Sequence, residues 1–369
     1  WVLGTVWWLY SYITTWWSGV LIGKCVIHGT SRGAGCSYPE MMAEAFGAPG
    51  YAFTAAMQIL TYYLVNVYLL VAVADWFLLS QDVLVVQGVS ASWCLCDYLV
   101  VSGVIAAILA QIRTFKRVLP FAAVSLASTA LRQGIMYYQI GSYSLMSECE
   151  PKFGGVTAHS AVISLSTTAF LFGGHGLFPE EIREMRRPES YFGALHASYV
   201  IIGAVYATNA YVGYAVWGQW TAADIQTNWP LNNATLVSAV LSIVWGLVEM
   251  AMSHVMMLSL VESHLGLGRP GGRRGGALRV LARTAVVVSE VFFAFMFSAA
   301  GLGNLEGVVA AFGFTALTYY APFAAYWKLF LRPRQAALGV QLCYGAVCLS
   351  GVLLTLAGLY ASLAGGGRD

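Results

Sequence analysis

Charged side chains are scarce in this chain. Only 10% of its 369 residues are Asp, Glu, Lys or Arg, whereas apolar residues make up 59%. An average soluble domain carries roughly 25% charged residues, so a soluble domain of this length would lack the charge needed to cover its surface. The mean hydropathy of +0.69 agrees. A net charge of only +2 gives no reason to expect a nucleic-acid partner. The composition therefore predicts an integral membrane protein.

Motifs that carry catalytic or metal chemistry are also missing. The seven cysteines are scattered, and Cys94 and Cys96 are too close together for zinc-ligand or redox spacing. We find no paired His/Asp metal motif, nucleophile elbow or phosphate-binding loop. Gly266, Gly268 and Gly271 match a dinucleotide fingerprint by letter, but no strand precedes them and their loop is rich in arginine. We expect neither enzyme activity nor a cofactor other than a coupling ion.

Long apolar stretches are abundant. A transmembrane helix needs about 20 mostly apolar residues, and ten stretches reach or approach that length. They predict an all-α polytopic membrane protein with ten transmembrane helices. The expected helices are residues 1–23, 51–79, 93–112, 117–140, 157–178, 191–217, 235–262, 280–301, 305–327 and 336–361.

The placement of basic residues supports this count. Of the 19 Lys and Arg residues, all but Arg132, Lys152 and Arg368 fall in alternate loops, and such loops are cytoplasmic. Both ends of the chain are then expected at the outer face. Arg132 lies inside an apolar stretch, and we expect its side chain to snorkel to a membrane surface. The cytoplasmic set is Lys24, Arg32, Arg113, Lys116, Arg117, Arg183, Arg186, Arg187, Arg269, Arg273, Arg274, Arg279, Arg283, Lys328, Arg332 and Arg334.

The chain begins with Trp1 inside an apolar run, without an initiator Met, a signal peptide or a polar lead-in. One additional span before Trp1 would place the N-terminus in the cytoplasm and bring the total to eleven. We therefore expect the sequence to be a fragment that begins part-way through a protein.

The most informative stretch runs from Phe170 to Glu189 and reads FLFGGHGLFPEEIREMRRPE. It resembles a signature of the amino acid/auxin permease family, in which an F-G-G-H segment precedes a hydrophobic pair, an acidic residue and a basic E-M-x-x-P loop. Weaker similarities follow the family's order along most of the chain, including its loop between the second and third spans. They lie at Trp1–Trp7, Tyr38–Pro39, Ala45–Gly47 and Gly213–Gly218.

This resemblance implies a single transmembrane transporter domain over residues 1–369, with the family's first span missing. It implies a LeuT-like fold of five-plus-five inverted repeats, incomplete here, around a midplane site. The implied function is secondary active transport of amino acids or related small carboxylates by proton-coupled symport. Sodium-coupled transport and a transport-inactive sensor or scaffold are alternatives. The implied partners are an amino acid-like solute and membrane lipids, in the plasma membrane or a vacuolar or other endomembrane.

The candidate substrate-binding residues are Phe172, Gly173, Gly174, His175 and Gly176. Each glycine weakens a helix by about 1 kcal/mol relative to alanine, and freed backbone in lipid must line a cavity or be buried in protein. Pro179 suits the first turn of a new helix. We predict an outer half-helix, a break and an inner half-helix, with backbone groups that bind the amino or carboxylate group of a zwitterion. Close helix packing is the alternative explanation for the glycines.

Two residues are candidates for coupling to an ion. His175 either carries a proton or acts as a neutral donor that holds the break in shape. Glu249 lies at the centre of the stretch 235–262, where a carboxylate usually faces a cavity or has a partner. It is either a proton or cation site, or a protonated glutamate bonded to a neighbouring helix. Family members often have a threonine near this position and a proline further along the same helix. This chain has neither near Glu249, which puts the usual ion chemistry in doubt.

Three further acidic residues lie within the apolar stretches. Asp75 and Asp97 are near the expected outer ends, where we predict them to be solvated. Glu290 lies one or two turns inside its stretch, and we expect it to pair with Arg283 on the same helix.

Overall fold

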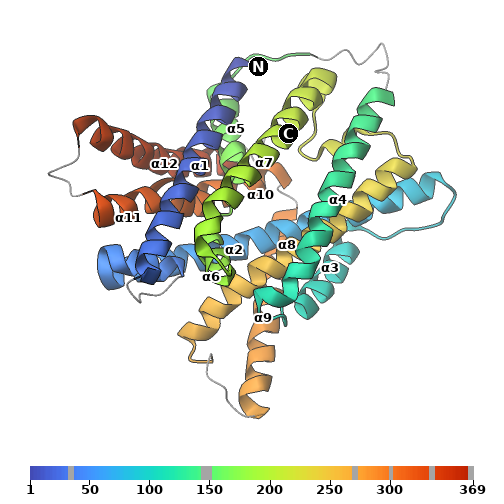
Figure 1. Cartoon of the computed structure of the whole chain (residues 1–369). Helices are drawn as coiled ribbons and strands as arrows, with labels where there is room; N and C mark the ends of the chain where they lie inside the picture. The colour runs from blue at the N-terminus through green and yellow to red at the C-terminus, as the bar shows by residue number, and fades with distance from the viewer. Residues whose placement is uncertain (32–36, 143–151, 268–272, 299–301, 332–336, 365–369) are drawn as a thin grey trace. The chain divides into compact units, whose positions relative to one another are not determined.

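The computed structural model describes residues 1–369 apart from 32–36, 143–151, 268–272, 299–301, 332–336 and 365–369. Within the described ranges every regular element is helical and no strand occurs (Figure 1). The all-α prediction is therefore confirmed. Five basic residues used to orient the chain lie outside the described residues, namely Arg32, Arg269, Arg332, Arg334 and Arg368.

Helices occupy each of the ten expected ranges. They are α1 (Val2–Ser31), α2 (Tyr38–Val86), α3 (Leu95–Leu109), α4 (Phe115–Ser142), α5 (Ala158–Leu171), α6 (Phe178–Glu184), α7 (Tyr191–Trp217), α8 (Asn233–His264), α9 (Arg273–Ser298), α10 (Leu302–Val309), α11 (Ala321–Phe330) and α12 (Leu338–Ala364). Two π-helical segments, Ala310–Phe314 and Ala316–Tyr320, lie between α10 and α11.

Length and hydropathy together identify the helices best suited to cross a membrane. In the described part of the chain six segments qualify, whereas α3 and α5 are apolar but shorter. Several membrane-crossing helices are thus present, and the number of ten spans stays a prediction. The six segments are Tyr38–Val86, Pro188–Trp220, Asn233–His264, Gly275–Ser298, Leu305–Phe330 and Leu338–Ala361.

The chain forms two compact units. The first unit contains residues 1–61, 156–204 and 303–369, and the second contains 62–155 and 205–302. Both α2 and α7 begin in the first unit and continue into the second. In the first unit α1 packs against α5, α6 and α11, and α12 packs against α5 and α11 (Figure 1).

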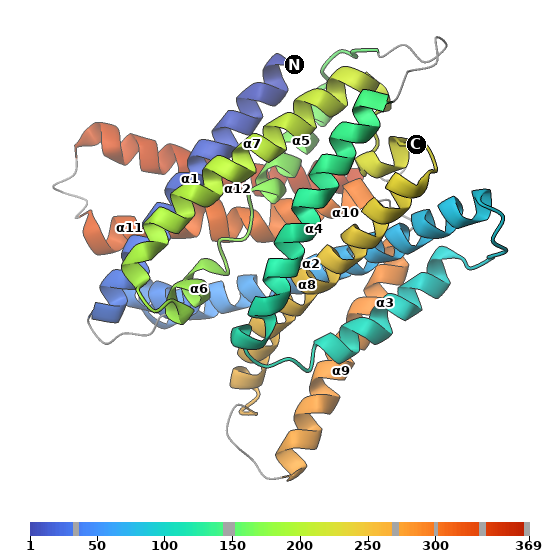
Figure 2. The same cartoon turned by 45° about the vertical axis from the view of Figure 1, so that its right-hand side comes forward.

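In the second unit α8 is flanked by α4 and α3, and α3 also packs against α9 (Figure 2). Because lipid is as apolar as the helix surfaces, close packing is what holds such helices together. Gly103 of α3 illustrates this, since an added Cβ would lie 2.5 Å from a Val291 methyl carbon on α9. A glycine at this position lets the two backbones approach.

Helix α2 begins earlier than the sequence suggested. The similarity of Tyr38–Pro39 and Ala45–Gly47 to a family loop implied a connection there, but α2 starts at Tyr38. A kink interrupts it at Gly47, where φ is +68° and ψ is −156°. Pro49 explains the kink, because proline removes a helical N–H donor and clashes with the preceding turn. The segment that was expected to be a loop is thus a short helix, joined at the kink to a long one.

The side chain of Arg132 lies between two helices, and its snorkelling to a membrane surface stays a prediction. Its Nη1 atom donates to the Ser242 hydroxyl of α8 at 2.9 Å. Its guanidinium lies 5.0 Å from the centre of the Trp245 ring, in cation–π geometry. Because α4 packs along α8, a polar partner and an aromatic face are within reach of Arg132. Its side chain therefore connects the two helices.

The pairing predicted between Arg283 and Glu290 was wrong. Arg283 Nε lies 2.5 Å from a carboxylate oxygen of Glu262 on α8. Its Nη1 donates to the Ala110 and Ile112 carbonyls that follow α3. Unpaired carbonyls at a helix end attract a cation, so neighbouring helices offer Arg283 better partners than its own helix does.

The two outer aspartates differ from each other. Asp97 is exposed, as predicted, and its Oδ2 accepts a hydrogen bond of 2.8 Å from the Cys94 backbone N–H at the start of α3. Asp75 is partly buried and lies close enough to Asp224 for the two carboxylates to interact. The solvated position expected for Asp75 is therefore only partly correct.

Candidate functional site

The predicted break between two half-helices is present. Helix α5 ends at Leu171 and α6 begins at Phe178, with non-helical backbone between them (Figure 2). Gly174 has a φ of +118°, a conformation that residues with a side chain rarely adopt. Pro179 lies in the first turn of α6, where a missing N–H costs nothing. The local sequence thus explains where the first helix stops and the second starts.

Three consecutive backbone donors at the break remain unused within the described residues. The chain closes two turns there, through Gly173 N–H to the Phe170 carbonyl and Leu177 N–H to the Gly174 carbonyl, both at 2.8 Å. The N–H groups of Gly174, His175 and Gly176 donate no hydrogen bond. Buried backbone donors are almost always paired. His175 and Gly176 are buried and Gly174 is partly buried, so these three donors are candidates for binding a ligand.

The side chain of His175 ties the break to α1. It is fully buried, and its Nε2 lies 2.8 Å from the Thr15 carbonyl oxygen. A carbonyl only accepts, so Nε2 carries the proton. The other ring nitrogen, Nδ1, has no hydrogen-bond partner among the described residues. The imidazole therefore anchors the break on one side and presents a free nitrogen on the other.

Gln58 holds the break from a second helix. This fully buried residue of α2 donates from Nε2 to the Gly176 carbonyl oxygen at 2.7 Å. Its own carbonyl oxygen, Oε1, has no partner in the described structure. The sequence analysis did not select Gln58, although an amide inside the apolar stretch 51–79 was a visible signal.

Phe172 belongs to an aromatic cluster of the first unit. Its ring is buried and packs against Trp8, Tyr12 and Tyr199, with ring centres 5.9, 5.6 and 6.3 Å away. Such offset and edge contacts stabilise ring pairs beyond simple burial. The Phe172 side chain is therefore committed to packing, and its part in any binding site is through its backbone.

A second irregular helix lies directly against the break. A Cβ added to Gly173 would lie only 2.5 Å from the ring of Phe314, which is the last residue of the first π-helical segment. π-Helical turns occur frequently at functional sites. Sequence analysis missed this segment, where Gly313 and Pro322 were the only local signals of irregularity.

Glu249 belongs to the second unit and is partly buried on α8. Both its carboxylate and the Arg132 guanidinium are close enough to the Tyr206 hydroxyl to interact with it electrostatically. Glu249 thus has polar surroundings, as expected for a carboxylate at membrane depth. His175 lies in the first unit.

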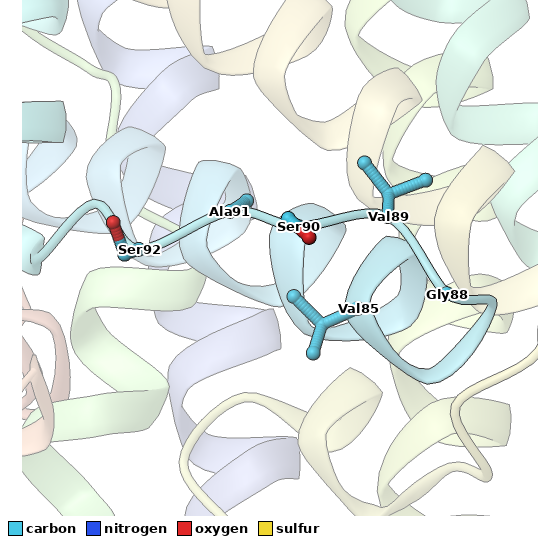
Figure 3. Close-up of a pocket in the computed structure, with 6 residues that line it drawn as sticks. All are labelled: Val85, Gly88, Val89, Ser90, Ala91 and Ser92. Atoms are coloured by element: carbon cyan, nitrogen blue, oxygen red, sulfur yellow. The ribbon is translucent and has the colours of Figure 1, made fainter.

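The described residues also form a surface cavity that is lined by other residues than those of the predicted site. A cavity of about 460 Å³ lies at the turn that follows α2, lined by Val85, Gly88, Val89, Ser90, Ala91 and Ser92 (Figure 3). None of the predicted site residues lines it, and no titratable side chain is among its lining residues.

The apolar helices and the helix broken within an apolar stretch define the chain as an integral, multi-pass membrane protein. Its sequence matches the family of transmembrane amino acid transporter proteins over residues 1–364. The chain belongs to that family, which confirms the family resemblance of the break and its flanking loop.

Three similar proteins are amino acid transporters of Arabidopsis thaliana. AVT1B is 24% identical over 203 residues, covering 55% of this chain and 36% of AVT1B. AVT1J is 22% identical over 201 residues, covering 54% of this chain and 46% of AVT1J. The match to AVT1I, 22% identical over 362 residues, covers 95% of this chain and 84% of AVT1I. The chain thus aligns with less than half the length of the first two. All three are named as transporters and not as enzymes.

Proposed function

We propose that this chain performs secondary active transport of amino acids or related small carboxylates, with the substrate bound at the break Phe172–Gly176. The observation that carries the proposal is the run of three unused N–H groups at Gly174, His175 and Gly176. A carboxylate is a natural ligand for free backbone N–H donors. Family membership supports the same class of substrate.

The polar side chains at the break suit the other end of a zwitterion. His175 Nδ1 and Gln58 Oε1 are buried atoms without a partner in the described residues, and both can accept hydrogen bonds from an ammonium group. The bonds to Thr15 and Gly176 hold the two side chains in place. Donors for a carboxylate and acceptors for an ammonium therefore occur together, as an α-amino acid requires.

The proposal includes the fold and the energy source. We assign residues 1–369 to one transporter domain with ten spans that belong to a LeuT-like fold of five-plus-five inverted repeats. Transport is coupled to protons, with Glu249 as the coupling carboxylate and His175 as a neutral donor that shapes the site. The single hydrogen bond of His175 to a carbonyl oxygen supports the neutral role.

Counterflow in proteoliposomes tests the proposal. The reconstituted protein should exchange labelled amino acid for unlabelled amino acid with saturable kinetics and no ion gradient. An inward proton gradient should then raise net uptake, and a sodium gradient should not. Failure of the folded protein to bind or exchange any of the common amino acids would contradict the proposal and favour a sensor or scaffold.

A further inference from the structure

Four polar residues form a buried chain of hydrogen bonds in the second unit. Asn66 of α2, His254 of α8 and Glu290 of α9 are all 0% exposed, and Ser253 of α8 is 3% exposed. None of them belongs to the break or to the surroundings of Glu249 described above. Ionisable residues at this depth in a membrane protein are costly and usually mark a functional site.

The hydrogen bonds connect the four side chains into one continuous network. The Ser253 hydroxyl donates to the amide oxygen of Asn66. The amide nitrogen of Asn66 donates to Oε1 of Glu290 at 3.0 Å. The other carboxylate oxygen of Glu290 lies 2.8 Å from His254 Nε2. Because Ser253 occupies the oxygen end of the Asn66 amide, the nitrogen end is held toward Glu290.

Counting protons shows what the Glu290–His254 pair can bind. With one proton, a neutral imidazole donates to a carboxylate and the pair carries a net charge of −1. With two protons, the pair is neutral, either as a carboxylic acid beside an imidazole or as a carboxylate beside an imidazolium. The Asn66 bond to Oε1 is compatible with both states. The two states differ by one proton, and burial favours the neutral one.

The groups around the pair offer no compensating positive charge. On α2, the Tyr63 phenol interacts electrostatically with Glu290 and donates to Ser289 at 3.0 Å. Along α8 the nearest titratable side chain is that of Glu249, which is acidic and lies about 7.5 Å from His254 at 1.5 Å per helical residue. The next are Glu262 on α8 and Arg283 on α9, about 12 Å and about 10 Å away along their helices. These two pair with each other, so together they leave the charge on the Glu290–His254 pair uncompensated.

The two other helices packed against α8 contribute no titratable group here. The buried residues of α3 are Leu99, Ser102, Gly103 and Ala106. Helix α4 meets α8 through the apolar cluster of Val118, Val248, Ala251 and Val255. A negative charge on the pair therefore has Asn66 as its only described side-chain donor besides His254.

We propose that Glu290 and His254 form a proton-binding site of this protein, with Asn66 and Ser253 as positioning residues. The pair holds two protons while α2, α8 and α9 are closed around it, and it releases one when water reaches it. The loaded proton therefore stabilises the packing of these three helices. This site is additional to Glu249 and to the substrate site at the break.

Infrared difference spectra of the reconstituted protein, recorded without substrate while the pH is changed, test this inference. The wild type should show a C=O stretching band of a carboxyl shielded from water, which grows as the pH falls. Glu290→Gln keeps the shape and the hydrogen-bonding ends of the side chain and should remove the band. Proton uptake measured by titration should fall by about one proton per chain in the same variant.

Two further variants sharpen the test. His254→Gln should retain the carboxyl band but shift its frequency, because Glu290 changes its partner. Ser298→Ala, at the end of α9, removes a hydroxyl that donates to the Phe295 carbonyl of its own helix and should leave the band unchanged. Persistence of the band and of the full proton count in Glu290→Gln would overturn the proposal. The proposal would also be overturned if the wild type showed no such band and bound no more protons than Glu290→Gln does.

The same vesicles separate this inference from the proposed transport function. Counterflow of amino acids reports on the break, whereas the infrared band reports on the pair in the absence of substrate. A band that depends on Glu290, in a protein that exchanges no amino acid, would support the proton site and contradict the transport proposal. Amino acid exchange by a protein without that band would support the transport proposal and contradict the proton site.

Discussion

The imidazole Nε2 of His175 lies 2.8 Å from the backbone carbonyl oxygen of Thr15, a residue 160 positions earlier in the chain. This one bond connects the broken helix to the middle of α1 and fixes which ring nitrogen is protonated. It also leaves Nδ1 available at the break. Several predictions about the break depend on this arrangement.

Substitution of His175 separates its two possible roles. A glutamine at position 175 can still donate to the Thr15 carbonyl, so His175→Gln should fold and retain substrate exchange and proton-driven uptake. His175→Ala loses the bond and about 1 kcal/mol or more of stability, and its thermal midpoint should fall. Loss of proton-driven uptake in His175→Gln, with exchange intact, would instead show that the histidine carries the proton.

Gly174→Ala tests the backbone conformation of the break. A Cβ at this position meets no atom within 4 Å, yet φ is +118°, so the change strains the backbone without crowding a neighbour. A strain of this kind costs of order 1–3 kcal/mol. We expect amino acid binding, measured on purified protein, to weaken at least tenfold.

A matched glycine provides the control. Gly193 lies in α7, and its added Cβ also meets nothing within 4 Å, so Gly193→Ala should leave binding unchanged. Gly203 is unsuitable, because a Cβ there would lie 2.6 Å from the Tyr12 ring. Equal affinities for Gly174→Ala and the wild type would assign the break to helix packing.

Gly173→Ala tests the contact between the break and the π-helical segment. The new methyl group would lie 2.5 Å from the Phe314 ring, and overpacking of this kind costs about 1–3 kcal/mol. Adding Phe314→Leu should restore part of the loss in thermal stability, because the smaller side chain vacates the contact. If the two substitutions are additive in a double-mutant cycle, this contact does not limit the approach of the two segments.

Glu249→Gln tests the proposed coupling carboxylate. The amide cannot take up a proton, so uptake driven by a pH gradient should be abolished while amino acid counterflow continues. Asp97→Asn is the control, since it removes an exposed carboxylate at the start of α3 and should change neither rate. Normal proton-driven uptake by Glu249→Gln would give the residue a structural role.

The orientation of the chain is open to chemical labelling. With all native cysteines replaced, a single cysteine at Gly275 or Gly276, in the basic first turns of α9, should react only from the cytoplasmic side. One placed within Gln219–Asn232 should react only from the outside, because the basic loops remain in the cytoplasm. Reaction of both positions from the same side would rule out the ten-span arrangement.

Features that depend on a few neighbouring residues were predictable from sequence. The break between α5 and α6 follows from Gly173, Gly174 and Gly176, which disfavour a helix, and from Pro179, which starts one. The all-helical, multi-pass character follows from composition, since only long apolar helices can satisfy the backbone in lipid. These properties are set locally or summed over the chain, so no knowledge of distant contacts was needed.

The choice of partners for buried polar groups was decided only by the tertiary structure. Glu290 was expected to pair with Arg283, yet it contacts His254 and Asn66, the latter 224 residues earlier in the chain. Which residues meet depends on the rotation of each helix about its axis and on the register between helices. Those variables are settled by the packing of many side chains at once, and for that reason the sequence alone determined the broken helix but not the residues that hold it.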